Sequence, residues 1–336
     1  MEIVTCISQI NKTVWSDFVI KHPNGNIFQT PEMYQVYLKT KNYEPVFLAV
    51  ENENKEILGV LLAVVQKEHK GLLGIFSSRA IIMGGPLIHK NDPDVLDFIL
   101  KEYNLLVKKK AIYSQCRNFW DWREHSEIFS SHGFLYEDHL NIIIDLKKSE
   151  EQLWSEVHSK RRNEIRRSLK EGTLFVISNT VDSLKICYQI LKNVYSRAKL
   201  PLPSYEHFQA LHNNSTDKQG LCIFTATYEG EIIGCLLGLV YKEVVYDYYA
   251  GALDNFYNKY PNDLIPWEVI KYVKQNGFTT FDFGGAGKPN VPYGVRDYKK
   301  KFGGDLVNYG RFEKVNKPIM YRMGKFGLKI YKKIKS

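Results

Sequence analysis

The sequence predicts an α/β protein with two mixed sheets, built by tandem duplication of one α/β unit. Three observations predict this class. An apolar hairpin pattern occurs twice, a helix and a strand follow each hairpin in the same order, and 336 residues fit two domains of roughly 150 residues each. The composition, with 44% hydrophobic and 25% charged residues, is that of a globular chain.

The repeated hairpin is the strongest of these signals. Residues 47–65 read FLAVENENKEILGVLLAVV, and residues 224–240 read FTATYEGEIIGCLLGLV. Each copy has a strand pattern, an acidic or glycine-containing turn, and then the shared letters E-I-[LI]-G before further apolar residues. The shared glutamates are Glu56 and Glu231, an offset of 175 residues (231 − 56). A nearly constant offset over several elements indicates duplication.

Helical periodicity follows each hairpin, at 95–107 and 264–273, and leads to the strand patterns AIYSQC and FTTFDF. We expect domains 1–148 and 149–336, because the strand IIIDL gives way there to KKSEEQ. Ser149 and Gln152 form a capping-box pattern. It predicts one helix over about 150–171 that ends at Gly172.

The cysteines and histidines indicate no metal site. Five cysteines are scattered without a CxxC pattern, and no HxxxH or HExxH pair occurs. We therefore expect a reduced, cytoplasmic monomer with no cofactor. The longest apolar runs have about nine residues, whereas a membrane-spanning helix needs about 20, and the N-terminus lacks the pattern of a secretory signal.

The net charge of +9 favours an anionic partner. Basic residues gather at 160–170, at 299–301 and in the tail 323–336. For each cluster, the alternative to anion binding is a solvated basic surface without a specific role. For the tail, we expect peripheral contact with the anionic inner face of a membrane.

Arg161 is the unusual residue of the first basic cluster. On a helical wheel it falls within an apolar arc. The residues of this arc are Leu153, Trp154, Val157, Ile165 and Leu169. A buried unpaired charge is costly. Arg161 therefore either pairs with an acid of the fold or points into a cleft, where it binds an anion.

Residues 281–289 read FDFGGAGKP, a strand that runs into glycines and a lysine. Neither the phosphate-binding G-x-x-x-x-G-K-[ST] pattern nor the dinucleotide-binding G-x-G-x-x-G pattern fits it. We expect Gly284 and Gly285 to form a sharp turn that shapes a cleft. Lys288 is then a residue of its rim.

Three stretches together resemble the FemABX family of peptidoglycan interpeptide-bridge aminoacyltransferases. They are IFQTPEMYQVY at 27–37, LWSEVHSKRRNEIRRSLKEG at 153–172 and FDFGGAGKPNVPYGVRDYKKKFGG at 281–304. The resemblance implies two tandem GNAT-like acyltransferase domains. It also implies transfer of an amino acid from aminoacyl-tRNA to an amine of a UDP-linked or lipid-linked muropeptide.

The resemblance also implies site residues. Lys299 takes the place of the family's cleft lysine, with Tyr298 beside it; Arg197 matches an arginine that holds the acceptor's phosphates, and Tyr248 matches a cleft tyrosine. Tyr37 stands where short members have a lysine. A tyrosine expected after the arginine falls near Pro201, so acceptor recognition in the first domain departs from the family pattern.

The residues themselves leave the chemistry partly open. Asp282 and Asp297 are the candidates for a general base, and Lys299 is the candidate for stabilising an oxyanion or clamping a phosphate. No [QR]-x-x-G-x-[GA] loop, which grips the pyrophosphate of acetyl-CoA, follows either hairpin.

Two alternatives to aminoacyl transfer stay open. One is an acyl-CoA- or acyl-carrier-dependent N- or O-acyltransferase of polysaccharide or lipid synthesis. The other is a non-catalytic module that binds anionic surfaces.

Overall fold

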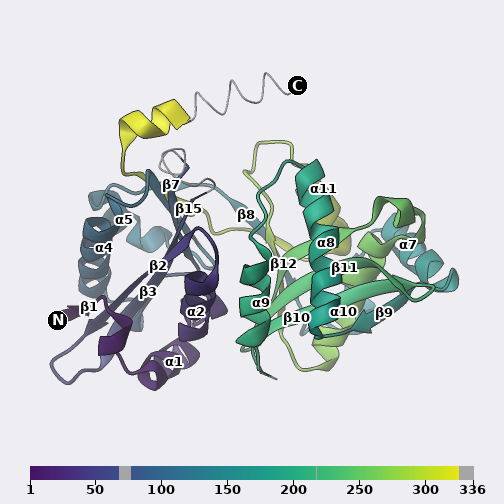
Figure 1. Cartoon of the computed structure of the whole chain (residues 1–336), viewed down its shortest axis with the longest axis horizontal. Helices are drawn as coiled ribbons and strands as arrows, with labels where there is room; N and C mark the ends of the chain where they lie inside the picture. The colour runs from purple at the N-terminus through teal and green to yellow at the C-terminus, as the bar shows by residue number, and fades with distance from the viewer. Residues whose placement is uncertain (68–76, 217, 325–336) are drawn as a thin grey trace. The chain divides into compact units, whose positions relative to one another are not determined.

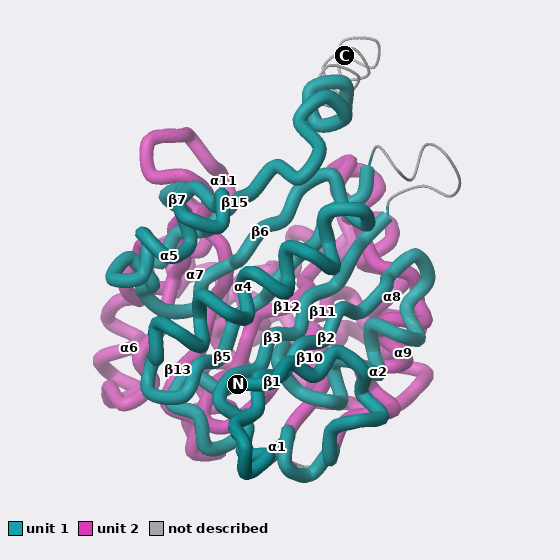
Figure 2. The backbone as a smooth tube through the Cα atoms, turned by 90° about the vertical axis from the view of Figure 1, so that its left-hand side faces the viewer, with its two compact units in different colours: residues 1–138, 309–336 teal, residues 139–308 magenta. Residues whose placement is uncertain are grey.

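The structure is a computed structural model that describes residues 1–67, 77–216 and 218–324. The chain forms two compact units, residues 1–138 with 309–336 and residues 139–308 (Figure 2). Each unit contains one mixed sheet with helices on its faces (Figure 1), and this confirms the predicted fold class. The unit boundary lies ten residues before the expected end of the first domain (148 − 138), and the chain returns to the first unit at Tyr309.

The first sheet has the strand order β1-β2-β3-β4-β6-β15-β7, and β5 pairs with β3. Its strands are β1 (Glu2–Val4), β2 (Tyr43–Glu51), β3 (Ile57–Gln66), β4 (Arg79–Met83), β5 (Leu87–Ile88), β6 (Tyr113–Arg117), β7 (Leu135–Glu137) and β15 (Arg311–Val315). The helices of this unit include α1 (Lys12–Lys21), α2 (Pro31–Lys39), α4 (Pro93–Val107) and α5 (Ser126–Ser131).

Side-chain alternation places helices on both faces of the first sheet. Leu48 of β2 lies in the buried cluster that contains Leu96 of α4. The neighbouring Phe47 points the other way, and its ring centroid lies 4.2 Å from that of Trp15 in α1.

The second sheet has the order β14-β8-β13-β12-β11-β10-β9. Its strands are β8 (Leu140–Asp145), β9 (Leu174–Ile177), β10 (Gly220–Tyr228), β11 (Glu231–Tyr241), β12 (Val244–Ala252), β13 (Thr280–Gly285) and β14 (Asp305–Asn308). The helices are α6 (Glu150–Glu156), α7 (Ser159–Lys170), α8 (Val181–Arg197), α9 (Tyr205–Asn213), α10 (Pro261–Gln275) and α11 (Gly294–Lys299).

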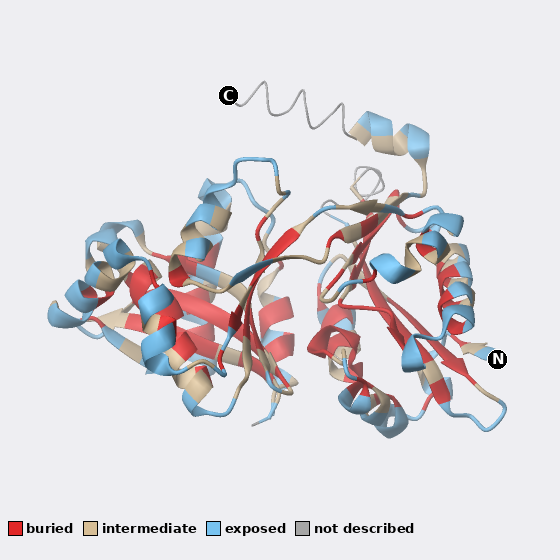
Figure 3. Cartoon of the chain, turned by 180° about the vertical axis from the view of Figure 1, so that it is seen from behind, coloured by how far each residue is buried: buried red, intermediate tan, exposed pale blue. Residues whose placement is uncertain are grey.

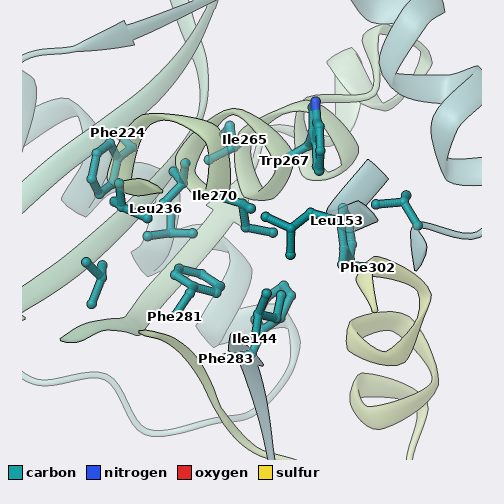
Figure 4. Close-up of a cluster of buried hydrophobic side chains, with 14 of the residues drawn as sticks. Ile144, Leu153, Phe224, Leu236, Ile265, Trp267, Ile270, Phe281, Phe283 and Phe302 are labelled. Carbon is teal, nitrogen blue, oxygen red and sulfur yellow. The ribbon is translucent and has the colours of Figure 1, made fainter. Parts of the chain in front are cut away.

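The core of the second unit lies between its sheet and α10. Phe224, Leu236 and Phe281 of the sheet pack with Ile265 and Ile270 of α10 in one buried cluster (Figure 4). The strands are the most deeply buried elements, and the outer sides of the helices are exposed (Figure 3).

Helix α8 covers the opposite face of this sheet. A Cβ atom on Gly234 would lie 2.9 Å from Pro261 of α10, whereas the Sγ atom of the next residue, Cys235, lies 3.8 Å from the carbonyl oxygen of Cys187 in α8. Adjacent residues of β11 therefore face different helices.

Both predicted hairpins are confirmed as the antiparallel pairs β2–β3 and β10–β11. The last strand of each copy does not pair within the sheet of its own copy, as a simple tandem repeat would require. Strand β8 ends the first copy but pairs with β13 and β14 in the second unit's sheet. Strand β15 ends the second copy but pairs with β6 and β7 in the first unit's sheet. The two copies have thus exchanged their last strands.

The single helix predicted over about 150–171 is wrong, because the chain forms α6 and α7 with a break between them. Val157 has extended geometry (φ −65°, ψ 128°), and the backbone N–H of His158 donates to the carbonyl of Lys301 at 2.8 Å. The wheel placed Leu169 in the apolar arc, and this is also wrong, because its side chain is exposed near the end of α7. The capping box at Ser149 and the positive φ of Gly172 are confirmed.

Among the described residues, every helix is too short or too polar to cross a bilayer. Most of the basic tail, from residue 325 onward, lies outside the described residues. The expected contact of the tail with a membrane stays a prediction.

Candidate active site

The second sheet opens between β12 and β13. These strands pair in parallel only from Val244 to Tyr246 of β12, although β12 continues to Ala252 and β13 to Gly285. A register shift against β11 places Asp247 opposite Gly238 and Tyr249 opposite Leu237, so that Tyr248 is the extra residue of a β-bulge. A bulge increases the local twist of its strand, which accounts for the separation of β12 from β13.

Lys299, at the end of α11, reaches into this opening. Its ammonium group donates to the carbonyl oxygen of Phe283 in β13 and lies 3.5 Å from the Oδ2 atom of Asp247 in β12. Only 13% of the Lys299 side chain and 9% of the Asp247 side chain are exposed. The amine therefore bridges two strands that no longer hydrogen-bond to each other.

Gly284 makes the turn beside this amine. Its φ of +77° is a conformation that residues with a Cβ atom rarely adopt, and an added Cβ would lie 3.7 Å from both the Lys299 amine and the Asp247 carbonyl oxygen. The Oδ1 atom of Asp282 accepts the Gly284 N–H at 2.7 Å. Asp282 therefore fixes the turn, and the turn brings Gly284 next to Lys299.

Two buried carboxyl groups surround the lysine. Burial raises the pKa of Asp282 to about 6, although the Gly284 N–H and the Lys299 charge both oppose that rise and the Asp247 charge adds to it. Burial also raises the pKa of Asp247, and the Lys299 charge again opposes the change. The other base candidate, Asp297, is exposed on α11.

Hydrogen bonds from Arg296 stabilise the loop between β13 and α11. Its guanidinium donates to the carbonyl oxygens of Ala286 at 3.3 Å, Lys288 at 2.7 Å and Val291 at 2.7 Å. Gly285 pairs with Asn141 of β8. Arg296 therefore joins α11 to this loop, a role that no motif in the sequence indicated.

Tyr298 and Arg161 belong to a second cluster. The Tyr298 hydroxyl donates to the carbonyl oxygen of Asn262 at 2.5 Å, and the Arg161 guanidinium lies 5.3 Å from the Tyr298 ring centroid. Arg161 also pairs with buried Asp263 and, at 3.0 Å, with Glu164. Arg161 thus has acidic partners within the fold, as one of the two sequence interpretations required.

Arg197 and Tyr248 lie on the α8 side of the sheet. Arg197, at the end of α8, pairs with Asp254 and donates to the Tyr257 hydroxyl at 3.0 Å, with half of its side chain exposed. The Tyr248 hydroxyl lies 2.8 Å from Nε2 of His207 in α9. His207 is fully buried, and burial lowers its pKa to about 3.

Tyr37 belongs to the first unit. It is buried in α2, and its ring centroid lies 6.3 Å from that of Tyr43. Burial raises the pKa of Tyr37, and the positive charge of Arg117 opposes that rise. The motif residue Gln29 has a structural role, because its amide bonds to both backbone groups of Leu62 and to the carbonyl of Met83.

The helix start that follows the opened strand carries an acid. In GNAT enzymes that bind acetyl-CoA, a glycine-rich loop at such a helix start grips the pyrophosphate. Here residues 254–260 read DNFYNKY, without glycine. Asp263, buried in the first turn of α10, adds negative charge where an anion would need N–H groups.

Two family models match most of the chain between them. Residues 10–131 match the FemAB family, and residues 159–300 match the acetyltransferase (GNAT) domain. Together, these matches support the assignment of the chain to the FemABX family. A lipid II:glycine glycyltransferase of Staphylococcus epidermidis is 33% identical over 102 residues, which are 26% of this chain and 24% of that protein. The match thus spans about a quarter of the curated relative.

Solved structures of the same fold include other tandem GNAT proteins. FemX has a TM-score of 0.72 and 17% identity, covering 96% of this chain and 99% of that one. A tandem GNAT protein from the clavulanic acid pathway has a TM-score of 0.60 and 9% identity, covering 94% and 98%. L-PGS from Bacillus licheniformis has a TM-score of 0.56 and 15% identity, covering 88% and 96%. At these identities the likeness concerns the fold.

Proposed function

We propose that this FemABX protein transfers an amino acid from aminoacyl-tRNA to an amine of a lipid-linked or UDP-linked peptidoglycan precursor. The observation that carries the proposal is the position of Lys299, whose amine lies in the opening between β12 and β13. The partial match to a lipid II:glycine glycyltransferase supports the acceptor class.

The reaction forms an amide and breaks an ester. The acceptor amine attacks the carbonyl carbon of the aminoacyl ester, and the C–O bond to the ribose then breaks. The proton that the amine loses goes to the ribose hydroxyl that leaves. Between these steps the carbonyl oxygen carries negative charge, which a fixed cationic donor such as Lys299 stabilises.

Asp282 is poorly placed as the proton acceptor. Its carboxylate is 6% exposed and already accepts the Gly284 N–H. Asp297 is exposed on α11. We therefore assign the proton transfer to groups of the substrates, and Asp282 to holding the turn.

Acyl-CoA is the less favoured donor. The glycine-free residues 254–260 and the buried Asp263 leave the start of α10 without the usual features of a pyrophosphate site. An acyl-carrier donor needs no such pyrophosphate site, so this argument does not count against it. The test below therefore includes an acyl-carrier protein as a separate donor.

The test is transfer by the purified chain. It is incubated with a UDP-linked or lipid-linked muropeptide and, in separate reactions, with charged tRNA, an acyl-CoA or an acyl-carrier protein. We expect the muropeptide to gain the mass of one or more amino-acid residues with charged tRNA. Lys299→Met is the inactive control. Transfer only from a thioester, or no transfer from any aminoacyl-tRNA, would refute the proposal.

A further inference from the structure

Lys299 and Asp247 meet at the opening of the second sheet, although they are 52 positions apart in the sequence (299 − 247). We propose that Asp247 is a positioning residue, which fixes the Lys299 ammonium across the opening so that one N–H is left for a substrate oxygen. This inference rests on the proposed function and adds a residue that no family motif in this chain marks.

The donors of the ammonium group can be counted. One N–H is donated to the carbonyl oxygen of Phe283, and a second faces the carboxylate of Asp247 at 3.5 Å. An ammonium group has three N–H donors. Within residues 1–67, 77–216 and 218–324, the third donor has no hydrogen-bonding partner. A single direction therefore remains for a ligand.

The Asp247 carboxylate extends from a paired strand and is nearly buried. The β-bulge at Tyr248 places Asp247 opposite Gly238 of β11, and 9% of its side chain is exposed. A long lysine side chain loses much rotamer freedom when it is fixed. Its ion pair with a carboxylate on a rigid strand offsets that loss before any substrate binds.

Asp247 also supplies the negative charge that faces the mostly buried Lys299 ammonium group. The ionisable groups around the pair are Asp282 on β13, Tyr195 on α8 and Tyr298 on α11. Of the acidic groups, Asp247 is the one in ion-pair contact with the amine. Removing the Asp247 charge leaves the Lys299 ammonium mostly buried with less negative charge around it, and this favours the neutral amine.

The first experiment measures the reactivity of the Lys299 amine and needs no activity assay. Intact protein is labelled with acetic anhydride across pH 7–10, and acetylation is quantified by tandem mass spectrometry at Lys299, with Lys300 and Lys301 as internal references. Neutral amines react, so Asp247→Asn should raise the Lys299 rate at least threefold at pH 8. Asp247→Glu should restore most of the protection. An unchanged Lys299 rate in Asp247→Asn overturns the inference.

The control is Asp182→Asn, which removes an exposed carboxylate that lies 3.2 Å from Lys185 of the same helix. Thermal melting of each variant separates local change from unfolding. If Asp247→Asn is unfolded at the labelling temperature, both proteins are labelled again at a lower temperature at which the variant is folded. Faster acetylation of Lys299 in the folded variant then supports the inference, and wild-type protection overturns it.

The second experiment uses the transfer assay. Asp247→Asn should lower kcat at least tenfold with little change in KM, and should move the alkaline limb of the pH–rate profile to lower pH. Wild-type kcat and pH dependence in Asp247→Asn would contradict positioning. If no aminoacyl-tRNA supports transfer but Lys299 labelling responds to Asp247, the proposed function fails and the positioning role stands.

Discussion

The Nε2 atom of His207 lies 2.8 Å from the hydroxyl oxygen of Tyr248, linking α9 to the bulge of β12. Because burial lowers the pKa of His207 to about 3, the imidazole is neutral near neutral pH and the contact is a hydrogen bond between neutral groups. It fixes a tyrosine that the family resemblance places in the substrate site.

This contact predicts coupling between the two side chains. His207→Asn and Tyr248→Phe should each lower the free energy of unfolding by about 1–3 kcal/mol, since each removes one partner of a hydrogen bond between buried His207 and half-buried Tyr248. The double variant should cost less than the sum of the singles by about 1 kcal/mol. Urea denaturation of the four proteins measures the cycle, and strictly additive losses would contradict the contact.

Lys299→Met should lower kcat of the proposed transfer by about 10²–10³-fold, the loss seen when one oxyanion donor is removed. Lys299→Arg should recover little of it, because a planar guanidinium does not reproduce the geometry of an ammonium group. Lys300→Met, in the exposed neighbour, is the matched control. A kcat of Lys299→Met close to that of the control would remove Lys299 from the chemistry.

Arg161→Met should destabilise the chain by about 3–5 kcal/mol, because it leaves the carboxylate of Asp263 buried without its cation. Asp263→Asn in the same protein should recover part of this loss, since burial already raises the pKa of Asp263 to about 6. Chemical denaturation at pH 8 makes the comparison. A loss of substrate affinity at unchanged stability would instead support Arg161 as a ligand-binding residue.

Asp282 predicts a dependence of stability on pH. Its pKa rises from 3.8 to about 6 on folding, so the folded state binds a proton that the unfolded state has released. Stability is therefore lost as pH rises from about 4 to about 6, by up to roughly 3 kcal/mol at 1.36 kcal/mol per pKa unit. Asp282→Asn should gain stability over wild type across this range and not below pH 4.

Unfolding curves at pH 4, 5, 6 and 7 check this sign, with Asp182→Asn as an exposed carboxylate control. A gain in stability of Asp282→Asn that is equal at every pH would show that the side-chain shape matters and the charge does not. Destabilisation that grows with pH would reverse the assignment, since it would mean that the ionised carboxylate stabilises the turn.

The duplicated fold was predictable because its signals are local. A hairpin is encoded by alternation and turn residues within about 20 positions, and so Glu56 and Glu231 mark equivalent hairpins. The partner of a strand is not encoded locally, and β8 therefore gave no sign that it pairs with β13. The break at Val157 was missed because its cause, a hydrogen bond from His158 to Lys301, is long-range.

The candidate site divides in the same way. Lys299 and Gly284 were named from a contiguous motif, and the structure places them together. Asp247 lies in the strand YKEVVYDYYAG, where nothing in the neighbouring letters distinguishes it from a solvated acid. Only the order of strands in the sheet brings its carboxylate to the lysine, and a single sequence does not contain that order explicitly.

The exchanged strands have a consequence for cooperativity. Two residues separate β7 from β8, and two separate β14 from β15, so each unit is joined to the other by two short links rather than one. If the first sheet unfolds, it releases β7 and β15. Each of these strands is joined through two residues to a strand of the second sheet, β8 or β14. We therefore expect one unfolding transition for the whole chain, and we expect a fragment ending at residue 148 to lack a strand that its own sheet requires.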